Sequence, residues 1–356
     1  MAKVKITGHA SGTGVVTVTA PNTSTDRTIT LPDATGTLLN SDGDGSSLTN
    51  LPSTSTADIR TAVTLQLTAD NNIGLGANAV DSITTGDHNV GLGVSALTSN
   101  TSGSKNIAVG RTALNNNTTA SGNSAIGSGA LYTNTTGANN TSVGLESMFS
   151  NTTGTGNSAF GAQALDANTT GASNTGLGFY ALSGNTTGVE NVSVGANSLE
   201  TNTTGVGNVA MGWKSLASNT TAGSNTGLGN EALRTNTTGA ENTAVGARSL
   251  YVNTTGYENV AIGYGALLVN TTGSWNTAVG HNTADNLTTG SHCASFGHNA
   301  TPSSAGVGNQ MTLGDGNINN LRCNDTSISS LSDSRDKTDI VDIPLGLSFI
   351  NTVRPV

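Results

Sequence analysis

The chain is dominated by a stretch, residues 83–303, that repeats itself at a fixed step of 17 residues. A Thr-Thr pair marks the step, first at Thr84-Thr85 and last at Thr288-Thr289. Thirteen copies follow one another without insertion or deletion, and their consensus reads N-T-T-G-x-x-N-T-A-V-G-x-x-A-L-x-x. A step that never slips indicates identical structural units, each stacked on its neighbour.

The length of the unit restricts the fold. Helical-hairpin repeats need more than about 30 residues, and leucine-rich repeats need about 20 or more. Each copy holds one short alternating segment, such as Asn259-Val260-Ala261-Ile262-Gly263, which predicts a β-strand. We therefore expect an all-β chain, a parallel β-solenoid of 17-residue coils whose strands stack at about 4.8 Å.

Two large apolar positions recur in each coil. The first is the third residue of the expected strand, Ile262 in the example, and we expect it to face the core while Ala261 faces outward. The second is a Leu or Met about five residues later, from Leu97 to Leu267. The Gly that follows the first position, from Gly93 to Gly297, should adopt a turn conformation that is closed to residues with a Cβ atom.

Two apolar positions per coil make a thin core. We expect three chains to associate and share it, because one chain would bury too little to offset its conformational entropy. A recurring Asn, from Asn89 to Asn276, is expected to form a hydrogen-bonded ladder between coils, and Cys293 takes that position in the last coil. The Thr-Thr pairs favour a hydroxyl ladder over an ice-binding face, because adjacent threonines point to opposite sides.

Composition excludes several classes of function. Only 34% of the residues are hydrophobic, and the net charge of −9 argues against a nucleic-acid partner or an anionic membrane. We expect no membrane insertion, no secretory signal, no cofactor and no metal site, with the scattered histidines in solvent. Two cysteines, Cys293 and Cys323, predict free thiols in a protein assembled in the cytoplasm.

The flanks of the repeat divide into four segments. Residues 1–60 read as short strands and a linker, and residues 61–82 as a degenerate lead-in that caps the stack. Residues 304–331 lose the step and are expected to form a β connector, and a new unit opens at residues 332–356.

The repeat resembles the head of trimeric autotransporter adhesins. The shared motif is N-x-A-x-G, found here as N-T-A-V-G at Asn242 to Gly246, although the coil is a few residues longer than in those adhesins. The resemblance implies a left-handed β-roll and a homotrimer. We expect no counterpart of their secretion signal and membrane anchor.

The C-terminal segment resembles the start of the endosialidase-type intramolecular chaperone of phage tail fibres and tailspikes. The motif S-D-x-R-x-K begins at Ser332 and R-P-V follows at residues 354–356. The resemblance implies a trimerising domain that cuts itself off before Asp333, with Ser332 as nucleophile and Lys337 as base. Because that domain normally runs on past R-P-V, we expect the bond to stay intact in this chain.

Aromatic residues in variable positions of the repeat are candidate receptor contacts. Variable positions should lie outside the core, where rings can contact a host surface glycan or protein, or can lie flat on neighbouring coils. These candidates are Phe179, Tyr180, Trp213, Tyr251, Tyr257, Tyr264 and Trp275.

Taken together, the patterns predict a phage tail fibre, a structural virion protein that mediates host attachment. Thr28 to Leu38 also resembles phage fibre sequence, which implies that residues 1–60 bind a tail or baseplate protein. The alternatives are a bacterial trimeric surface adhesin and a glycan-degrading tailspike. An enzyme is not expected, since glycoside hydrolysis needs two paired carboxylates and the acids of the repeat stack nowhere as a pair.

Overall fold

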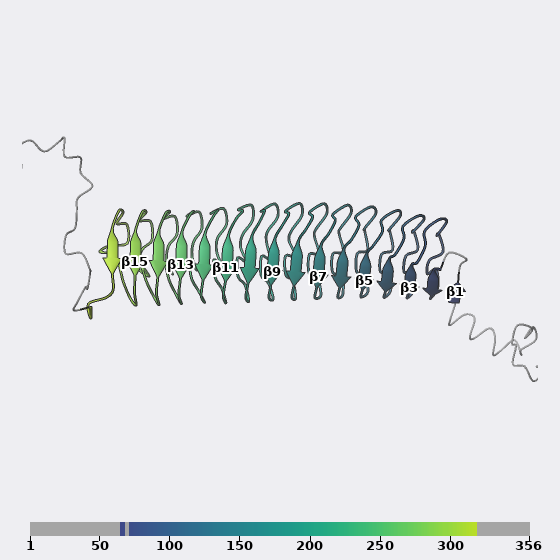
Figure 1. Ribbon diagram of the computed structural model, residues 1–356, viewed down its shortest axis with the longest axis horizontal. Helices are drawn as coiled ribbons and strands as arrows, with labels where there is room; N and C mark the ends of the chain where they lie inside the picture. Colours follow the sequence, from purple (N-terminus) through teal and green to yellow (C-terminus); the bar gives the residue numbers. More distant parts are fainter. Residues whose placement is uncertain (1–64, 68–70, 319–356) are drawn as a thin grey trace, which may run out of the picture. The chain divides into compact units, whose positions relative to one another are not determined.

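The computed structural model describes residues 65–67 and 71–318, and every described element is a β-strand of three residues. The strands form one sheet in chain order (Figure 1). They are β1 (Leu65–Leu67), β2 (Ile73–Leu75), β3 (Val90–Leu92), β4 (Ile107–Val109), β5 (Ser124–Ile126), β6 (Thr141–Val143), β7 (Ser158–Phe160), β8 (Thr175–Leu177), β9 (Val192–Val194), β10 (Val209–Met211), β11 (Thr226–Leu228), β12 (Thr243–Val245), β13 (Val260–Ile262), β14 (Thr277–Val279), β15 (Ala294–Phe296) and β16 (Met311–Leu313).

The strands from β2 to β16 stack in parallel, each one coil after the last. Every residue of these strands pairs with the residue 17 positions along the chain, as Val260 does with Thr277. This register confirms the predicted β-solenoid of 17-residue coils. At the start of the stack β1 pairs with β2 in the antiparallel sense, with Leu65 opposite Leu75.

The stack extends beyond the thirteen copies read from the sequence. The lead-in forms β2, in register with β3. At the other end β16 pairs with β15, with Ala294 opposite Met311, so the step continues past residue 303. The expectation that residues 304–331 lose the step is therefore wrong as far as Leu313. Beyond Gly314 a second compact unit begins, of which residues 315–318 are described.

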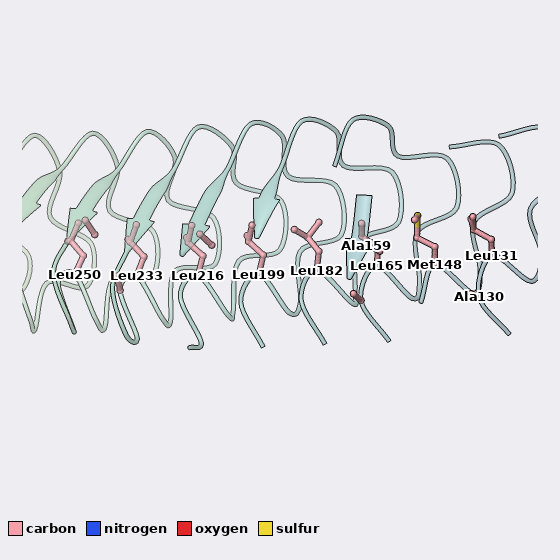
Figure 2. Packing of buried hydrophobic residues seen from close by; sticks show 14 of the residues in the cluster. Ala130, Leu131, Met148, Ala159, Leu165, Leu182, Leu199, Leu216, Leu233 and Leu250 are labelled. Atoms are coloured by element: carbon pink, nitrogen blue, oxygen red, sulfur yellow. The ribbon is translucent and has the colours of Figure 1, made fainter. Parts of the chain in front are cut away.

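The core is a column of leucines that runs along the stack (Figure 2). Its members are fully buried, which confirms the second apolar position as a core position. They are Leu97, Leu114, Leu131, Met148, Leu165, Leu182, Leu199, Leu216, Leu233, Leu250 and Leu267.

The strands face the opposite way to the expectation. Ala261, the middle residue of β13, is fully buried, whereas Ile262 is 40% exposed. The same pattern holds from β2 to β15: the middle residue is buried and the third residue is half-buried or exposed. The prediction that the third residue faces the core is therefore wrong.

The leucine column explains this orientation, because it fills the space beneath the strands. A Cβ atom built on Gly176, the middle residue of β8, would lie 3.4 Å from Cγ of Leu165 and 3.1 Å from the carbonyl oxygen of Ala181. Gly227, the middle residue of β11, stands in the same relation to Leu216, also at 3.4 Å. Only Gly, Ala or Ser fits there, so the large residues of each strand turn outward.

One chain encloses this core completely, since the leucine column is buried without a second copy. The reason we gave for three chains, a core that they share, is therefore wrong. The number of chains becomes a separate question, which concerns the outer surface.

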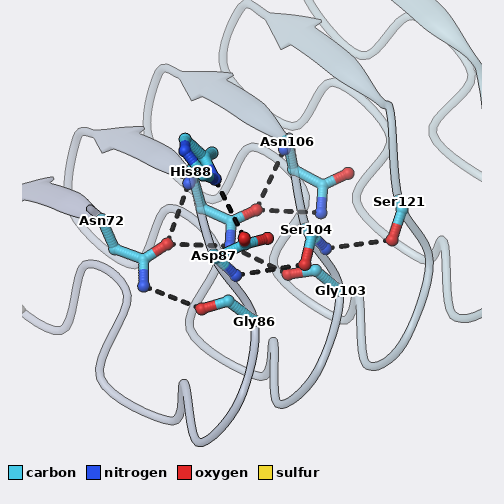
Figure 3. Close-up of polar contacts among 9 residues, drawn as sticks. Asn72, Gly86, Asp87, His88, Gly103, Ser104, Asn106 and Ser121 are labelled. Atoms are coloured by element: carbon cyan, nitrogen blue, oxygen red, sulfur yellow. Dashed lines mark hydrogen bonds and ion pairs between the residues drawn. The ribbon is translucent and has the colours of Figure 1, made fainter. Parts of the chain in front are cut away.

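Two asparagine ladders line the coil, one of them predicted and one missed. In the predicted ladder, the side-chain oxygen of Asn89 accepts from both the backbone and the side-chain amide of Asn106, at 2.9 and 3.1 Å (Figure 3). In the second ladder, which contains one Asn per coil from Asn100 to Asn270, the Asn117 amide donates to the Asn100 oxygen at 2.8 Å. Buried amides are thus paired from coil to coil, as burial requires.

A single backbone carbonyl connects the two ladders in each coil. The carbonyl oxygen of Gly103 accepts from the side-chain amide of Asn89 at 2.8 Å and from that of Asn100 at 2.9 Å. The predicted hydroxyl ladder is also present, because Thr135 Oγ1 donates to the carbonyl oxygen of Thr152 at 3.1 Å and the pattern repeats along the stack. Polar contacts of this kind fix the distance between coils.

Candidate binding surface

The solenoid carries its candidate site on its outer face, since its interior is filled. Several residues singled out from the sequence fall outside the part of the chain that the structure describes. Ser332, Asp333 and Lys337, the residues implied for self-cleavage, lie outside the described residues, as do the attachment segment 1–60 and Cys323.

An apolar stripe runs along the outer face of the sheet. We use this name for the third residues of β2 to β16, all of which are apolar. Its most exposed described members are between 37% and 49% exposed: Leu75, Ile126, Phe160, Leu177, Met211, Ile262, Phe296 and Leu313. Phe160 and Phe296, expected in the core, therefore belong to the outer surface.

The aromatic candidates lie beside this stripe. Phe179, Trp213 and Tyr264 follow the stripe residue of their own coil by two positions, and they are 52%, 44% and 47% exposed. Trp275 and Tyr257, at the other end of the strands, are 42% and 37% exposed. Tyr180 and Tyr251 are half-buried. Most of the candidates are thus exposed, as the variable positions predicted.

Two groups of rings gather around the last coils. In the first, before the strands, the Tyr257 ring meets the Trp275 ring edge to face at 4.6 Å, and Trp275 stacks on His292 at 4.7 Å. The indole nitrogen of Trp275 also donates to the Glu258 carboxylate at 3.1 Å. This first group combines apolar ring faces with a fixed hydrogen-bond acceptor.

The second group follows the strands of the same coils. Tyr264 stacks on His281 at 5.2 Å, and His281 stacks on His298 at 5.3 Å. The stripe residues of β13, β14 and β15 lie between the two groups along the chain. The two alternatives for the aromatic residues, exposure to a partner and packing on neighbouring coils, are therefore compatible: the rings contact neighbouring coils and still leave much of their surface exposed.

The histidines were the part that sequence reasoning missed, since we expected them to be scattered in solvent. The signal was present in the repeat. Trp275 and His292 are 17 residues apart, as are Tyr264 and His281, so each pair occupies one position of successive coils. Residues at one position of a solenoid lie above one another at about 4.8 Å, the distance at which rings stack.

Tyr251 belongs to neither group of rings, and its ring lies between two arginines. The guanidinium groups of Arg248 and Arg234 lie 4.8 and 5.6 Å from its ring centroid, and Arg234 Nη1 donates to its hydroxyl at 2.6 Å. Glu231 pairs with both arginines, at 2.7 Å with Arg234 and 3.6 Å with Arg248. The ring is therefore engaged on its own chain, and Tyr251 is the weakest of the receptor candidates.

Asp166 is the acid of the repeat whose environment disfavours its charged form. Burial raises the pKa of Asp166, and the nearby charge of Glu146 raises that pKa further. Gln163 donates to Glu146 at 3.2 Å.

Within residues 65–67 and 71–318 no group of three or more His, Cys, Asp or Glu side chains could hold a metal ion. The same part of the chain contains no helix long and apolar enough to cross a membrane. Comparisons with models of known families, with curated proteins and with solved structures found no match for this chain.

Proposed function

We propose that this chain is a phage tail fibre, a structural virion protein that attaches the particle to a host cell surface. In this proposal three copies form a homotrimeric fibre of left-handed solenoids. Residues 1–60 bind a tail or baseplate protein. The observation that carries the proposal is the pair of exposed aromatic groups around β13 to β15, presented by a stack of coils with continuous hydrogen bonding.

A surface glycan is the receptor that these groups fit best. Aromatic faces such as that of Trp275 pack against the C–H faces of sugar rings, and a carboxylate such as Glu258 accepts hydrogen bonds from sugar hydroxyls. Stacking of each ring on the next coil fixes its orientation before binding, which reduces the entropy lost when the ligand binds.

The C-terminal motif supports the assembly part of the proposal. The resemblance of Ser332 to Lys337 to the phage chaperone implies a trimerising domain, cut off before Asp333 in a longer chain. Mass spectrometry that finds a new N-terminus at Asp333, absent in the Ser332→Ala variant, would support self-cleavage at this bond.

The first test of the function is the location of the protein. Peptides of this chain should be found in purified particles of the phage whose genome encodes it. The runner-up, a bacterial surface adhesin, is favoured by the N-x-A-x-G motif at Asn242 to Gly246 and predicts the chain on the bacterial surface instead. Its recovery from bacterial envelopes and not from particles would overturn the tail-fibre proposal.

The second test concerns the receptor site. Fluorescently labelled chain should bind host cells, and Tyr257→Ala combined with Trp275→Ala should reduce that binding at least tenfold. A matched control is Phe149→Ala, because Phe149 also stacks on an aromatic residue, Tyr132 at 4.9 Å, but on earlier coils. Equal loss of binding in both variants, with both folded, would contradict a receptor site around β13 to β15.

A further inference from the structure

The apolar stripe is long, continuous and unexplained by the fold. All fifteen stripe residues, from Leu75 in β2 to Leu313 in β16, are apolar, although they face away from the core. The first residues of the same strands also face outward and are Val, Ile, Thr, Ser, Ala or Met. A sheet face in contact with water normally carries charged or strongly polar residues. The outward face of this sheet carries no charged residue, and its third positions are all apolar.

Charged side chains are segregated from the stripe. Every Asp, Glu, Lys and Arg in residues 71–318 lies outside the strands, in the turns of the coil. They are Asp81, Asp87, Lys105, Arg111, Glu146, Asp166, Glu190, Glu200, Lys214, Glu231, Arg234, Glu241, Arg248, Glu258, Asp285 and Asp315. Interfaces between copies of one protein have this composition, an apolar centre from which charges are excluded.

The face is as large as a major apolar patch and amounts to more than half of a standard interface. From β2 to β16 the stack takes fourteen steps, which at about 4.8 Å each gives a length of about 67 Å. The first and third residues of a strand are about 7 Å apart, so between these two rows the face covers about 470 Å². This lies in the upper half of the range for the largest apolar patch of a typical monomer, about 300–600 Å², and is more than half of the roughly 800 Å² that each partner contributes to a standard interface.

The repeat itself indicates the occupant. A partner that covers the whole face must match a spacing of one coil over fifteen strands, and a second copy of this chain has that spacing by construction. A partner with another repeat would fall out of register within a few coils. We propose that copies of this chain pack against one another through the apolar stripe, in parallel and in register.

Symmetry sets the register. If several copies surround one axis that is parallel to the stack, each stripe residue meets its own equivalent at the same level. Phe160 then meets Phe160 and Val194 meets Val194, so the variation in side-chain size along one stripe is matched on the next. The number of copies, three, rests on the proposed function, whereas the face and the register rest on the described residues.

The test of the face compares substitutions in and beside the stripe. Ile126→Lys with Met211→Lys places two charges in the stripe, at positions 44% and 49% exposed. The control, Val94→Lys with Leu145→Lys, places the same charges in the turn beside it, at positions 50% and 54% exposed. Sedimentation at micromolar concentration should show an oligomer for the unmodified chain and for the control, and a folded monomer for the stripe variant.

A monomeric unmodified chain would overturn the proposal, and so would equal dissociation of both variants. A monomer would leave the stripe to a different partner, such as the host receptor. A monomer would also overturn the trimer of the proposed function, whereas cell binding by the aromatic groups would be unaffected, so the attachment role and the stripe interface fail separately.

Cross-linking tests the register and does not depend on how well the lysine variants fold. In a Cys323→Ser background, Val194→Cys should form a disulfide with its equivalent on a neighbouring copy, since bonding requires Cα atoms within about 7 Å. An antiparallel arrangement would instead link Leu75→Cys to Leu313→Cys. An oligomer that shows the second cross-link, or that fails to form the first, would overturn the parallel register.

Discussion

The side-chain amide of Asn185 donates to the side-chain oxygen of Asn168, one coil earlier, at 2.8 Å. The same amide donates to the carbonyl oxygen of Gly188 at 3.0 Å, and the Asn185 oxygen accepts from Asn202 at 2.9 Å. All these groups are buried, so each depends on the ladder for its hydrogen bonds. The ladder thus pairs the buried side-chain amides from coil to coil, just as the sheet pairs the backbone amides.

Replacing a residue within this ladder should be costly. Asn185→Ala removes three hydrogen bonds and leaves the Asn202 amide with one acceptor fewer. We expect a loss of about 2–4 kcal/mol, since a buried polar group left without its partner costs about 1–3 kcal/mol. Asn270→Ala is the control, because the Asn270 oxygen, at the end of the ladder, has no partner already. Equal shifts in the thermal unfolding midpoint would contradict the role of the ladder.

The Gly after each strand should be irreplaceable. Gly178 has a φ of 141°, and a Cβ atom there would lie 2.7 Å from the backbone of Gly195 on the next coil. We expect Gly178→Ala to separate the coils and lower the yield of folded protein sharply. Gly207→Ala should cost only about 1–2 kcal/mol, because Gly207 has a φ of 66° and nothing within 4 Å of the added atom. Circular dichroism measures the folding and the thermal midpoint of both variants. Similar spectra and similar midpoints would refute the predicted difference.

The orientation of the strands can be tested at two adjacent residues. Ala261→Leu adds three carbons beneath the sheet, where overpacking costs about 1–3 kcal/mol. Ile262→Leu changes the shape of an outward side chain and should alter stability by less than about 0.5 kcal/mol. Urea unfolding of both variants measures the difference. A larger effect at Ile262 would mean that the stripe faces the core after all.

Serines beneath the sheet should differ according to their partners. Ser142 Oγ donates to the Ser147 carbonyl oxygen at 2.8 Å and contacts the Ser147 hydroxyl, whereas the buried Ser295 Oγ has no hydrogen-bond partner. We expect Ser142→Ala to destabilise the chain by about 1 kcal/mol. Ser295→Ala should leave stability unchanged or raise it. Thermal unfolding of the two single variants decides, and a loss at Ser295 as large as that at Ser142 would show an unrecognised partner.

The raised pKa of Asp166 predicts a specific dependence on pH. Its folded-state pKa lies above the unfolded value of about 3.9, because burial and then Glu146 disfavour the charged form. The stability gained from the protonated form of Asp166 is therefore fully present below the unfolded-state pKa, and it is lost as the pH rises through the folded-state pKa. Asp166→Asn should thus raise the thermal midpoint at neutral pH and lose this advantage at acidic pH.

Glu146→Gln offers a comparison for Asp166. It removes the smaller cause of the shift and leaves the larger one, burial. We expect a change in the same direction as for Asp166→Asn but smaller. A lower midpoint for Asp166→Asn at neutral pH would mean that the carboxylate is stabilised in the folded chain.

The 17-residue step by itself determined the fold class, the strand positions and the leucine column. A step that repeats without slippage allows only one kind of stacking, so Asn89 and Asn106, or Trp275 and His292, had to lie above one another. The aromatic columns, including the histidines, could therefore have been read in full from the spacing. The position of Leu313, one coil beyond the recognisable motif, could not, since only pairing with β15 revealed it.

Only the tertiary structure decided which face of each strand lies inside. Alternation separates Ala261 from Ile262, but it has the same form whichever of the two is buried. The decision came from space: Leu165 and its equivalents fill the narrow coil, so the small residue turns inward and the large residue outward. Volume inside a closed coil depends on contacts between residues about eleven positions apart, as for Leu165 and Gly176, and a pattern along the strand does not contain that information.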